Sequence, residues 1–284
     1  MRVSLFTNYG ALNSPPIFDA FAEGCDENIV WNDMDADVAV IWSILFAGRM
    51  APNREVWDHY TKRNRPIIVI EVGALLRNET WRVGIGGINN GANFANKENL
   101  EEDRVEKFGI KLKPWKEEGQ FITIATQRPD SHQWSSMPTV ETYVQNAVNN
   151  IRKHCDKDIV IRPHPRDRIT DFEKISKENK NVYFDVPKSI GESDKVNFSD
   201  ILSRSYCVVN HSSNPALEAT INGIHTFTGC QSFAYPMSIK HWGNLTNPPR
   251  EDRELWLKQL THIEWWPEEI AKGKPWNRLK NYLW

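Results

Sequence analysis

Short apolar runs alternate along the chain with segments in which apolar residues recur every three or four positions. Short runs are typical of buried strands, and the longer spacing is typical of amphipathic helices. We predict strands at residues 3–6, 38–42, 66–71, 121–125, 158–161, 182–185 and 206–209. We predict helices at residues 17–23, 52–64, 139–154, 171–179, 198–203 and 214–222. Strands that alternate with helices predict an α/β fold with parallel sheets.

The alternation stops at a polar connector, residues 114–119, and then restarts. A chain of 284 residues suits two domains of ordinary size. We therefore predict an N-terminal domain at 1–118, a C-terminal domain at 119–250 and a helical tail at 251–284. The tail has an apolar face, which predicts packing against the N-terminal domain, and its many acidic residues disfavour an anionic membrane surface.

Residues 81–96 are rich in glycine and asparagine and show neither period, so we predict a long loop there. Long loops in compact domains are commonly functional, which makes this one a candidate contact for an acceptor substrate. The pair Gly84 and Gly86 is not a dinucleotide-binding fingerprint, because the third glycine and the following helix are missing.

The predicted strand at 206–209 runs through polar residues into a predicted helix at Asn214. Ser212 and Ser213 would then lie at the helix N-terminus, where backbone N–H groups and the helix dipole favour an anion such as phosphate. Glu218 follows in the second turn, where its carboxylate can accept hydrogen bonds from ribose hydroxyls. The alternative is that the serines only cap the helix and that Glu218 is a solvated helix residue.

Polar residues follow three predicted strands in this half of the chain. Parallel strands share one carboxyl edge, so we expect these residues to line a single crevice built for a phosphorylated ligand. A proline follows His164, which holds its backbone extended and aims the imidazole above the strand; the alternative is a buried histidine that a backbone carbonyl satisfies. The crevice residues are Gln127, Arg128, Asp130, Ser131, Arg162, His164, Arg166, Asn210, His211, Ser212, Ser213 and Glu218.

Three short motifs in this order resemble the capsule-polysaccharide glycosyltransferases, which include retaining transferases of the acidic sugar Kdo. The motifs are Gln-x-x-Asp-Ser from Gln127, His-Pro at His164, and Ser-Ser-x-x-x-x-Glu-Ala from Ser212. The likeness continues through residues 223–235 and covers roughly Phe121 to Tyr235. Arg162 stands where that family usually has lysine, and the N-terminal half carries no matching motif.

The resemblance implies a GT-B-like fold, in which two Rossmann-like domains with parallel sheets face a central cleft. It implies that the N-terminal domain binds the acceptor and the C-terminal domain binds the nucleotide sugar. It assigns His164, Ser212, Ser213 and Glu218 to donor binding, and it assigns Asp130 to the anomeric carbon.

The same roles follow from the chemistry of the residue types. A carboxylate such as Asp130 can stabilise or trap an oxocarbenium-like state, and Arg128, His164, Arg166 and the serines can hold the charge of the departing phosphate. Glu71, which ends the predicted strand at 66–71, can serve as general base for the acceptor hydroxyl, or it can simply cap a loop. No cluster of acidic residues in the sequence looks dedicated to a divalent metal, so we expect no metal and no cofactor beyond the nucleotide sugar itself.

Charge, cysteine spacing and apolar-run length limit the expected partners and compartment of the protein. A net charge of -2 argues against affinity that comes mainly from neutralising a nucleic-acid backbone. The four cysteines are widely spaced and match no metal pattern, so we expect reduced thiols. No signal-peptide pattern and no apolar run of the ~18 residues that a membrane span needs is present, so the cytoplasm is the expected compartment.

Two classes of function remain open from the sequence. The first is a glycosyltransferase of hexosyl, pentosyl or Kdo type, with retention implied by the resemblance. Its acceptor hydroxyl belongs either to a surface glycan or to a hydroxymethylated base in DNA. The second is a nucleotide-sugar-binding module, a sugar-nucleotide epimerase or a glycerol-phosphate transferase on the same fold.

Overall fold

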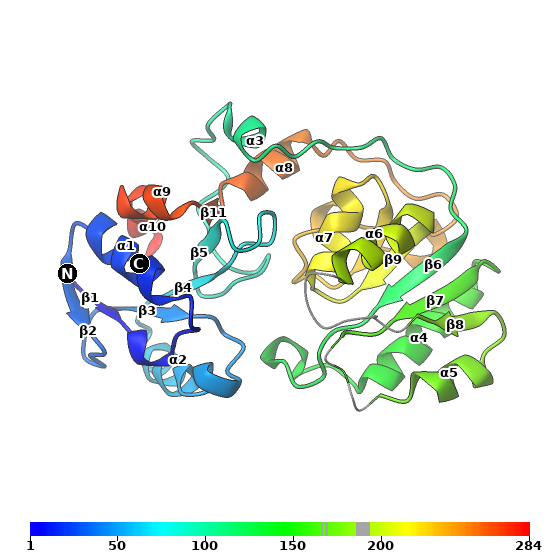
Figure 1. Cartoon of the computed structure of the whole chain (residues 1–284), viewed down its shortest axis with the longest axis horizontal. Coiled ribbons are helices and arrows are strands. Elements are labelled where there is room, and N and C mark those ends of the chain that lie inside the picture. Colours follow the sequence, from blue (N-terminus) through cyan, green and yellow to red (C-terminus); the bar gives the residue numbers. More distant parts are fainter. Residues whose placement is uncertain (166, 168–169, 186–193) are drawn as a thin grey trace. The chain divides into compact units, whose positions relative to one another are not determined.

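The computed structural model of the chain describes residues 1–165, 167, 170–185 and 194–284. The chain divides into two compact units. The N-terminal unit comprises Met1–Ile110 together with Glu254–Trp284, and the C-terminal unit comprises Lys111–Arg253. Each unit is built on one sheet, so the predicted α/β class with two Rossmann-like units is confirmed (Figure 1).

The sheet of the N-terminal unit has the strand order β11-β5-β4-β3-β1-β2. Strands β1 to β4 pair in parallel, whereas β5 pairs antiparallel with both β4 and β11. The strands are β1 (Arg2–Leu5), β2 (Asn28–Trp31), β3 (Val38–Trp42), β4 (Ile67–Val72), β5 (Trp81–Ile85) and β11 (Glu264–Trp265). The prediction of a parallel sheet is therefore wrong for this edge of the unit.

Strand β5 also corrects the predicted loop at 81–96, because its first five residues are a strand. The alternation of apolar and polar residues that marks a strand is weak here, because Gly84 interrupts it. A side chain at that position would lie 2.5 Å from the ring of Phe94, so the close packing of Phe94 on the strand requires glycine there.

Helices cover both faces of this sheet. One face packs on α1, α9 and α10 around Phe18, Phe21 and Trp276, and the other packs on α2 through Val56 and Tyr60. The helices of the unit are α1 (Pro15–Gly24), α2 (Asn53–Lys62), α3 (Arg104–Lys107), α8 (Glu254–Thr261), α9 (Pro267–Ala271) and α10 (Lys274–Leu279). Because both faces are buried, the apolar runs of β3 and β4 are nearly continuous.

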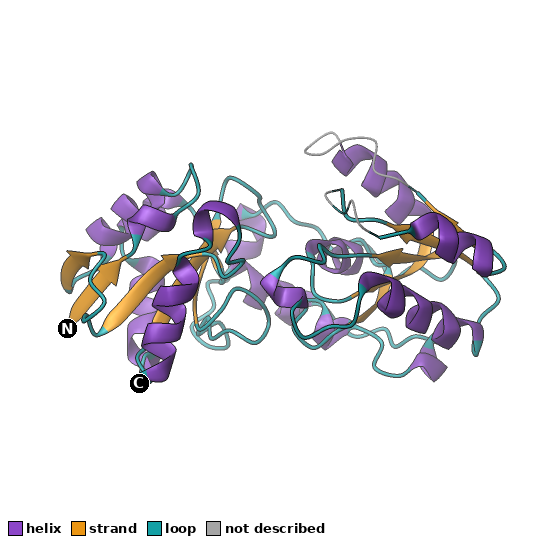
Figure 2. Ribbon diagram, turned by 90° about the horizontal axis from the view of Figure 1, so that it is seen from below, coloured by secondary structure: helices purple, strands orange, loops and turns teal. Residues whose placement is uncertain are grey.

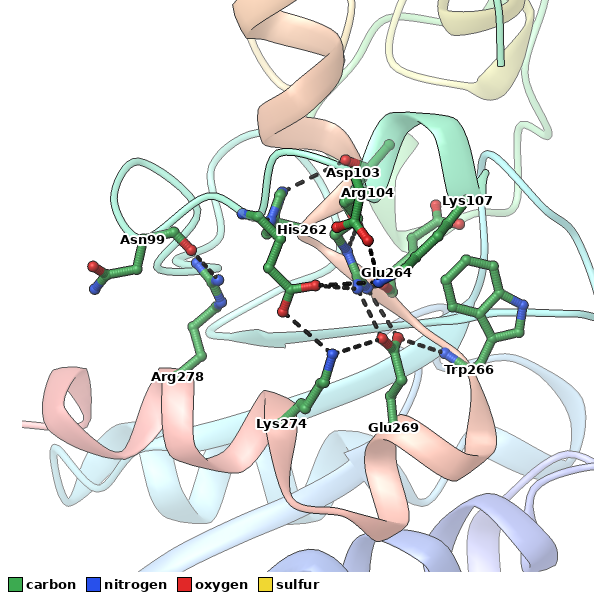
Figure 3. Close-up of polar contacts among 12 residues, drawn as sticks. Asn99, Asp103, Arg104, Lys107, His262, Glu264, Trp266, Glu269, Lys274 and Arg278 are labelled. Atoms are coloured by element: carbon green, nitrogen blue, oxygen red, sulfur yellow. Dashed lines mark hydrogen bonds and ion pairs between the residues drawn. The ribbon is translucent and has the colours of Figure 1, made fainter. Parts of the chain in front are cut away.

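The C-terminal segment, which we define as Glu254–Trp284, is fixed to the rest of the unit through the fully buried side chain of Arg104 (Figure 3). Its guanidinium donates to the carbonyls of Thr261 and Glu264, each at 2.5 Å, and forms a two-pronged ion pair with the Glu269 carboxylate at 2.9 and 3.0 Å. These contacts hold residues 261–269 against α3.

The sheet of the C-terminal unit is parallel throughout, with the strand order β10-β9-β6-β7-β8. Helices α4 and α5 cover one face, and α6 and α7 cover the other (Figures 1 and 2). The elements are β6 (Phe121–Ala125), α4 (Val140–Arg152), β7 (Asp158–Arg162), α5 (Phe172–Glu178), β8 (Val182–Phe184), α6 (Asp194–Arg204), β9 (Ser205–Asn210), α7 (Asn214–Ile221) and β10 (His225–Thr228).

Short 3-10 turns complete the two units. They lie at Thr7–Tyr9, Gly48–Met50, His132–Trp134, Tyr235–Met237, Trp242–Asn244 and Lys280–Tyr282.

Candidate functional site

The sheet of the C-terminal unit reverses its strand order between β6 and β9. From β6 the chain moves to β7 and β8 on one side, and it then returns to place β9 and β10 on the other. Such a reversal leaves a crevice outside the carboxyl ends of the two strands, and open α/β sheets bind their ligands there. Ala125, at the end of β6, pairs in register with both Asn210 and Arg162, so the polar segments after β6, β7 and β9 begin at one level of one edge.

Gln127 and Ser212 join the two strands at this reversal. The amide oxygen of Gln127 accepts the backbone N–H of Ser212 at 3.0 Å, and its amide nitrogen lies 3.1 Å from the Ser212 hydroxyl. Both side chains are buried. Gln127 therefore holds the entry to α7 at a fixed height above β6.

Asn210 makes a second lock at the same place. Its amide donates to the carbonyl of Ala125 at 2.9 Å and to the hydroxyl of Ser213 at 2.9 Å, and its oxygen accepts the Ser213 N–H. Ser213 is the residue before the first turn of α7, but its side chain makes no capping hydrogen bond. The expectation that the N–H groups of Ser212 and Ser213 are open to a phosphate is wrong, because Gln127 and Asn210 already accept them.

Asp130 lies in the loop after β6 and pairs with Arg128. Arg128 Nε donates to one Asp130 carboxylate oxygen at 2.7 Å, and its Nη2 contacts the other. This pairing lowers the pKa of Asp130 below its ordinary value, and the nearby charge of His164 acts in the same direction. Asp130 is exposed and ionised, as a nucleophile or a charge stabiliser must be. Ser131 follows in the same loop and is half-buried.

Two predicted site residues, Arg162 at the end of β7 and His164 just after it, have different surroundings. Arg162 is buried and its guanidinium pairs with the carboxylate of Asp185, which follows β8. It therefore braces two strand ends. His164 is half-buried, and its backbone N–H donates to the hydroxyl of Thr126 at 3.0 Å. Arg166, which the sequence assigned to the donor, lies outside the described residues.

His211 is clasped between two loops. Its ring lies edge-on to Trp134, with centroids 5.4 Å apart, and a side chain at Gly229 would reach within 2.7 Å of its Nδ1. Burial lowers the pKa of His211 below its ordinary value of 6.5, so the imidazole is neutral near pH 7. A cavity of about 210 Å³ adjoins it, with walls that include Phe227 and Trp242.

The two remaining candidates lie elsewhere. Glu218 is on the second turn of α7, and its side chain is exposed. Glu71 belongs to the N-terminal unit, where it is half-buried near the carboxyl end of β4 and accepts the N–H of Val72 at 2.9 Å. Sequence reasoning missed the pairing of Asp185 with Arg162 and the packing of Trp134 and Gly229 on the ring of His211. Both depend on contacts between segments that lie apart in the sequence.

Within the described ranges, no three His, Cys, Asp or Glu side chains gather as a metal site. Among the helices of those same ranges, none has both the length and the apolar character to cross a membrane.

Comparison with known proteins gives a likeness of fold but no match of sequence. No family model and no curated protein matches the sequence. Among solved structures, the chain is similar to two from Thermosulfurimonas dismutans, KpsC beta Kdo 2,4 transferase and KpsC beta Kdo 2,7 transferase. The first aligns with a TM-score of 0.55 and 13% identity, over 93% of this chain and 90% of that chain. The second aligns with a TM-score of 0.54 and 12% identity, over 96% of this chain and 98% of that chain.

At these identities the likeness extends to the fold, which is glycosyltransferase-like. A third alignment, to the S. aureus MnaA–UDP co-structure, has a TM-score of only 0.34 at 11% identity, which does not establish a shared fold.

Proposed function

We propose that the chain is a glycosyltransferase that moves a sugar from a nucleotide-activated donor to an acceptor hydroxyl. One observation carries the proposal: the polar ends of three neighbouring parallel strands meet at the reversal point of the C-terminal sheet. Parallel α/β sheets bind nucleotides at such points. The likeness of the fold to the two Kdo transferases supports sugar transfer over other nucleotide chemistry.

In this proposal the C-terminal unit binds the donor. Arg128 and His164 hold the negative charge of the departing nucleotide, which leaves with the electron pair of the broken C–O bond. Asp130 stabilises the oxocarbenium-like carbon or forms a transient bond to it, and the second course leads to retention. Glu218 and the hydroxyl of Ser213 contact the ribose and phosphate.

The N-terminal unit binds the acceptor in the same proposal. The acceptor oxygen forms the new bond to the anomeric carbon, and its proton passes to the carboxylate of Glu71. The acceptor is a surface glycan or a hydroxymethylated base in DNA. We expect the reaction to need no metal and to take place in the cytoplasm.

The test is a panel of CMP-, UDP-, GDP- and ADP-linked sugars, with release of the nucleotide as the signal. Each donor is incubated alone, with a glycan acceptor, with hydroxymethylated DNA, and with EDTA. We expect one nucleotide to be released, faster with one acceptor and unaffected by EDTA. The absence of release from every donor would contradict the proposal.

Asp130→Asn tests the mechanism, with Asp200→Asn as a matched control. Both aspartates are exposed and paired with an arginine, but Asp200 lies on α6 and pairs with Arg204. We expect Asp130→Asn to lower kcat by about a hundredfold or more, and Asp200→Asn to leave it unchanged. Full activity of Asp130→Asn would remove Asp130 from the mechanism.

A further inference from the structure

The carboxylate of Glu264, in β11, is completely buried in the N-terminal unit. It accepts hydrogen bonds from three consecutive backbone N–H groups, those of Ala74 at 2.5 Å, Leu75 at 3.0 Å and Leu76 at 3.4 Å. The hydroxyl of Thr80 donates to it as well, at 2.7 Å. Bonds from neutral donors to a carboxylate are stronger than bonds between neutral groups, so this carboxylate organises residues 73–80.

Residues 73–80, which we call the β4–β5 loop, close tightly around this carboxylate. The N–H of Gly73 donates to the carbonyl of Thr80 at 2.8 Å, which joins the two ends of the loop. A side chain at Gly73 would lie 2.6 Å from a Glu264 oxygen and 2.5 Å from the Thr80 hydroxyl. Only glycine fits at this approach, so the loop and the carboxylate are shaped to each other.

The loop begins two residues after Glu71, and Glu264 lies in the same row of the sheet as that residue. Glu71 on β4 pairs in register with Arg82 on β5, and Arg82 pairs in register with Glu264 on β11. Arg82 is buried and donates to the carbonyls of Val72 and Ile88 at 3.0 and 2.7 Å. Burial lowers the pKa of Arg82, and the charges of Glu71 and Glu264 act against that change, as expected for a guanidinium near both carboxylates.

The backbone of Glu264 is held in place by other contacts of the C-terminal segment. Arg104 donates to the backbone carbonyl of Glu264 and pairs with Glu269, and Lys274 adds a contact to Glu269 at 3.1 Å (Figure 3). The segment from 261 to 274 therefore fixes the Glu264 backbone independently of the loop that its side chain orders.

We propose that Glu264 is a positioning residue for acceptor binding: it orders the β4–β5 loop beside Glu71 and so fixes the site that receives the acceptor hydroxyl. This inference rests on the proposed glycosyltransferase function and on Glu71 as its base. It gives the C-terminal segment a role in transfer to the acceptor, distinct from donor binding. A small displacement of a positioned group can cost a large factor in rate, which is why an ordered loop matters here.

The test compares Glu264→Gln with Glu268→Gln. Each variant removes one carboxylate from the C-terminal segment, but Glu268 is exposed on α9 and is not part of the Arg104–Glu269 ion pair. Two readouts are taken well below the Tm of both variants. The first is hydrogen exchange of the amides of residues 74–76. The second is the ratio of sugar transfer to donor hydrolysis by water.

We expect Glu264→Gln to speed exchange at residues 74–76 and to lower the transfer-to-hydrolysis ratio at least tenfold, with hydrolysis itself retained. We expect Glu268→Gln to change neither. Thr80→Val removes only one donor to the carboxylate, so it serves if Glu264→Gln does not fold, with an expected fall in the ratio of about threefold.

Two results would overturn the inference while leaving the function in place. One is unchanged exchange of these amides in Glu264→Gln, and the other is faster exchange with an unchanged transfer-to-hydrolysis ratio. The absence of any turnover by the unsubstituted protein is a different failure. It contradicts the proposed function and the inference with it.

Discussion

Replacing Gln127 by leucine removes the bridge between β6 and the start of α7 at nearly constant side-chain volume. In the unsubstituted protein Gln127 accepts the N–H of Ser212 and contacts its hydroxyl, and both residues are at most 7% exposed. Leucine leaves the Ser212 N–H buried without this acceptor. A buried group that loses its partner costs about 1–3 kcal/mol, so we expect a loss near the middle of that range.

The variant should also bind the donor poorly, because the loop after β6 loses its direct contact with Ser212 at the start of α7. Gln145→Leu is the matched control: Gln145 lies on α4 and its amide donates to the side chains of Asn149 and Asn179. The assay is calorimetric titration of the nucleotide that the donor panel identifies, together with chemical denaturation. We expect Gln127→Leu to weaken binding about tenfold or more, equivalent to about 1.4 kcal/mol, and Gln145→Leu to leave it unchanged. Unchanged affinity in Gln127→Leu, with the expected loss of stability, would refute the placement of the donor at this edge.

Three further predictions concern other buried groups. Burial lowers the pKa of His225 and of His262 to about 4, whereas a histidine in the unfolded chain has a pKa near 6.5. Below pH 6.5 the unfolded chain therefore binds protons that the folded protein does not. We expect the free energy of unfolding to fall as the pH falls from 6.5 toward 4, by up to about 3 kcal/mol for each histidine. A denaturation midpoint that is constant from pH 7 to pH 5 would contradict this. Gly229→Ala should displace the ring of His211 and destabilise the protein by about 1–3 kcal/mol, measured by denaturation. An unchanged midpoint would mean that the ring of His211 is not packed closely against residue 229. Arg104→Met should cost about 3–5 kcal/mol by the same measurement, since it leaves the buried carbonyls of Thr261 and Glu264 without this donor and removes one of the two cationic partners of Glu269. A cost below about 1 kcal/mol would show that the C-terminal segment is held by its apolar contacts.

The strands of the C-terminal unit were largely predictable from their apolar runs. Residues 121–125 match β6, and the runs at 158–161 and 206–209 lie within β7 and β9. Their polar ends were predictable for the same reason, since a buried strand that emerges at an edge changes composition abruptly. The order of the strands, which puts the reversal between β6 and β9, required the structure.

The N-terminal unit was less predictable because its edge depends on distant pairing. Strand β5 is interrupted by Gly84, and its other neighbour, β11, is only two residues long. The row of Glu71, Arg82 and Glu264 joins residues that lie far apart in the sequence. No local pattern distinguishes Glu264 from the other acidic residues of the C-terminal segment, so its contact with the β4–β5 loop had no signal in the sequence.

The availability of the helix N-terminus was also beyond sequence reasoning. The pattern at Ser212 and Ser213 predicts open N–H groups, but the side chains of Gln127 and Asn210 accept them. Arg162 likewise resembles a phosphate ligand in sequence and pairs with Asp185 in the structure. Polar side chains at a strand end can serve the fold or a ligand, and only their partners distinguish the two.

A crystal structure of the protein with its nucleotide product bound tests the central claim most directly. The account predicts the phosphate at the carboxyl edge of the C-terminal sheet, outside the ends of β6 and β9, within hydrogen-bond distance of Arg128 or His164. A nucleotide bound at the amino ends of these strands, or in the N-terminal unit, would contradict it.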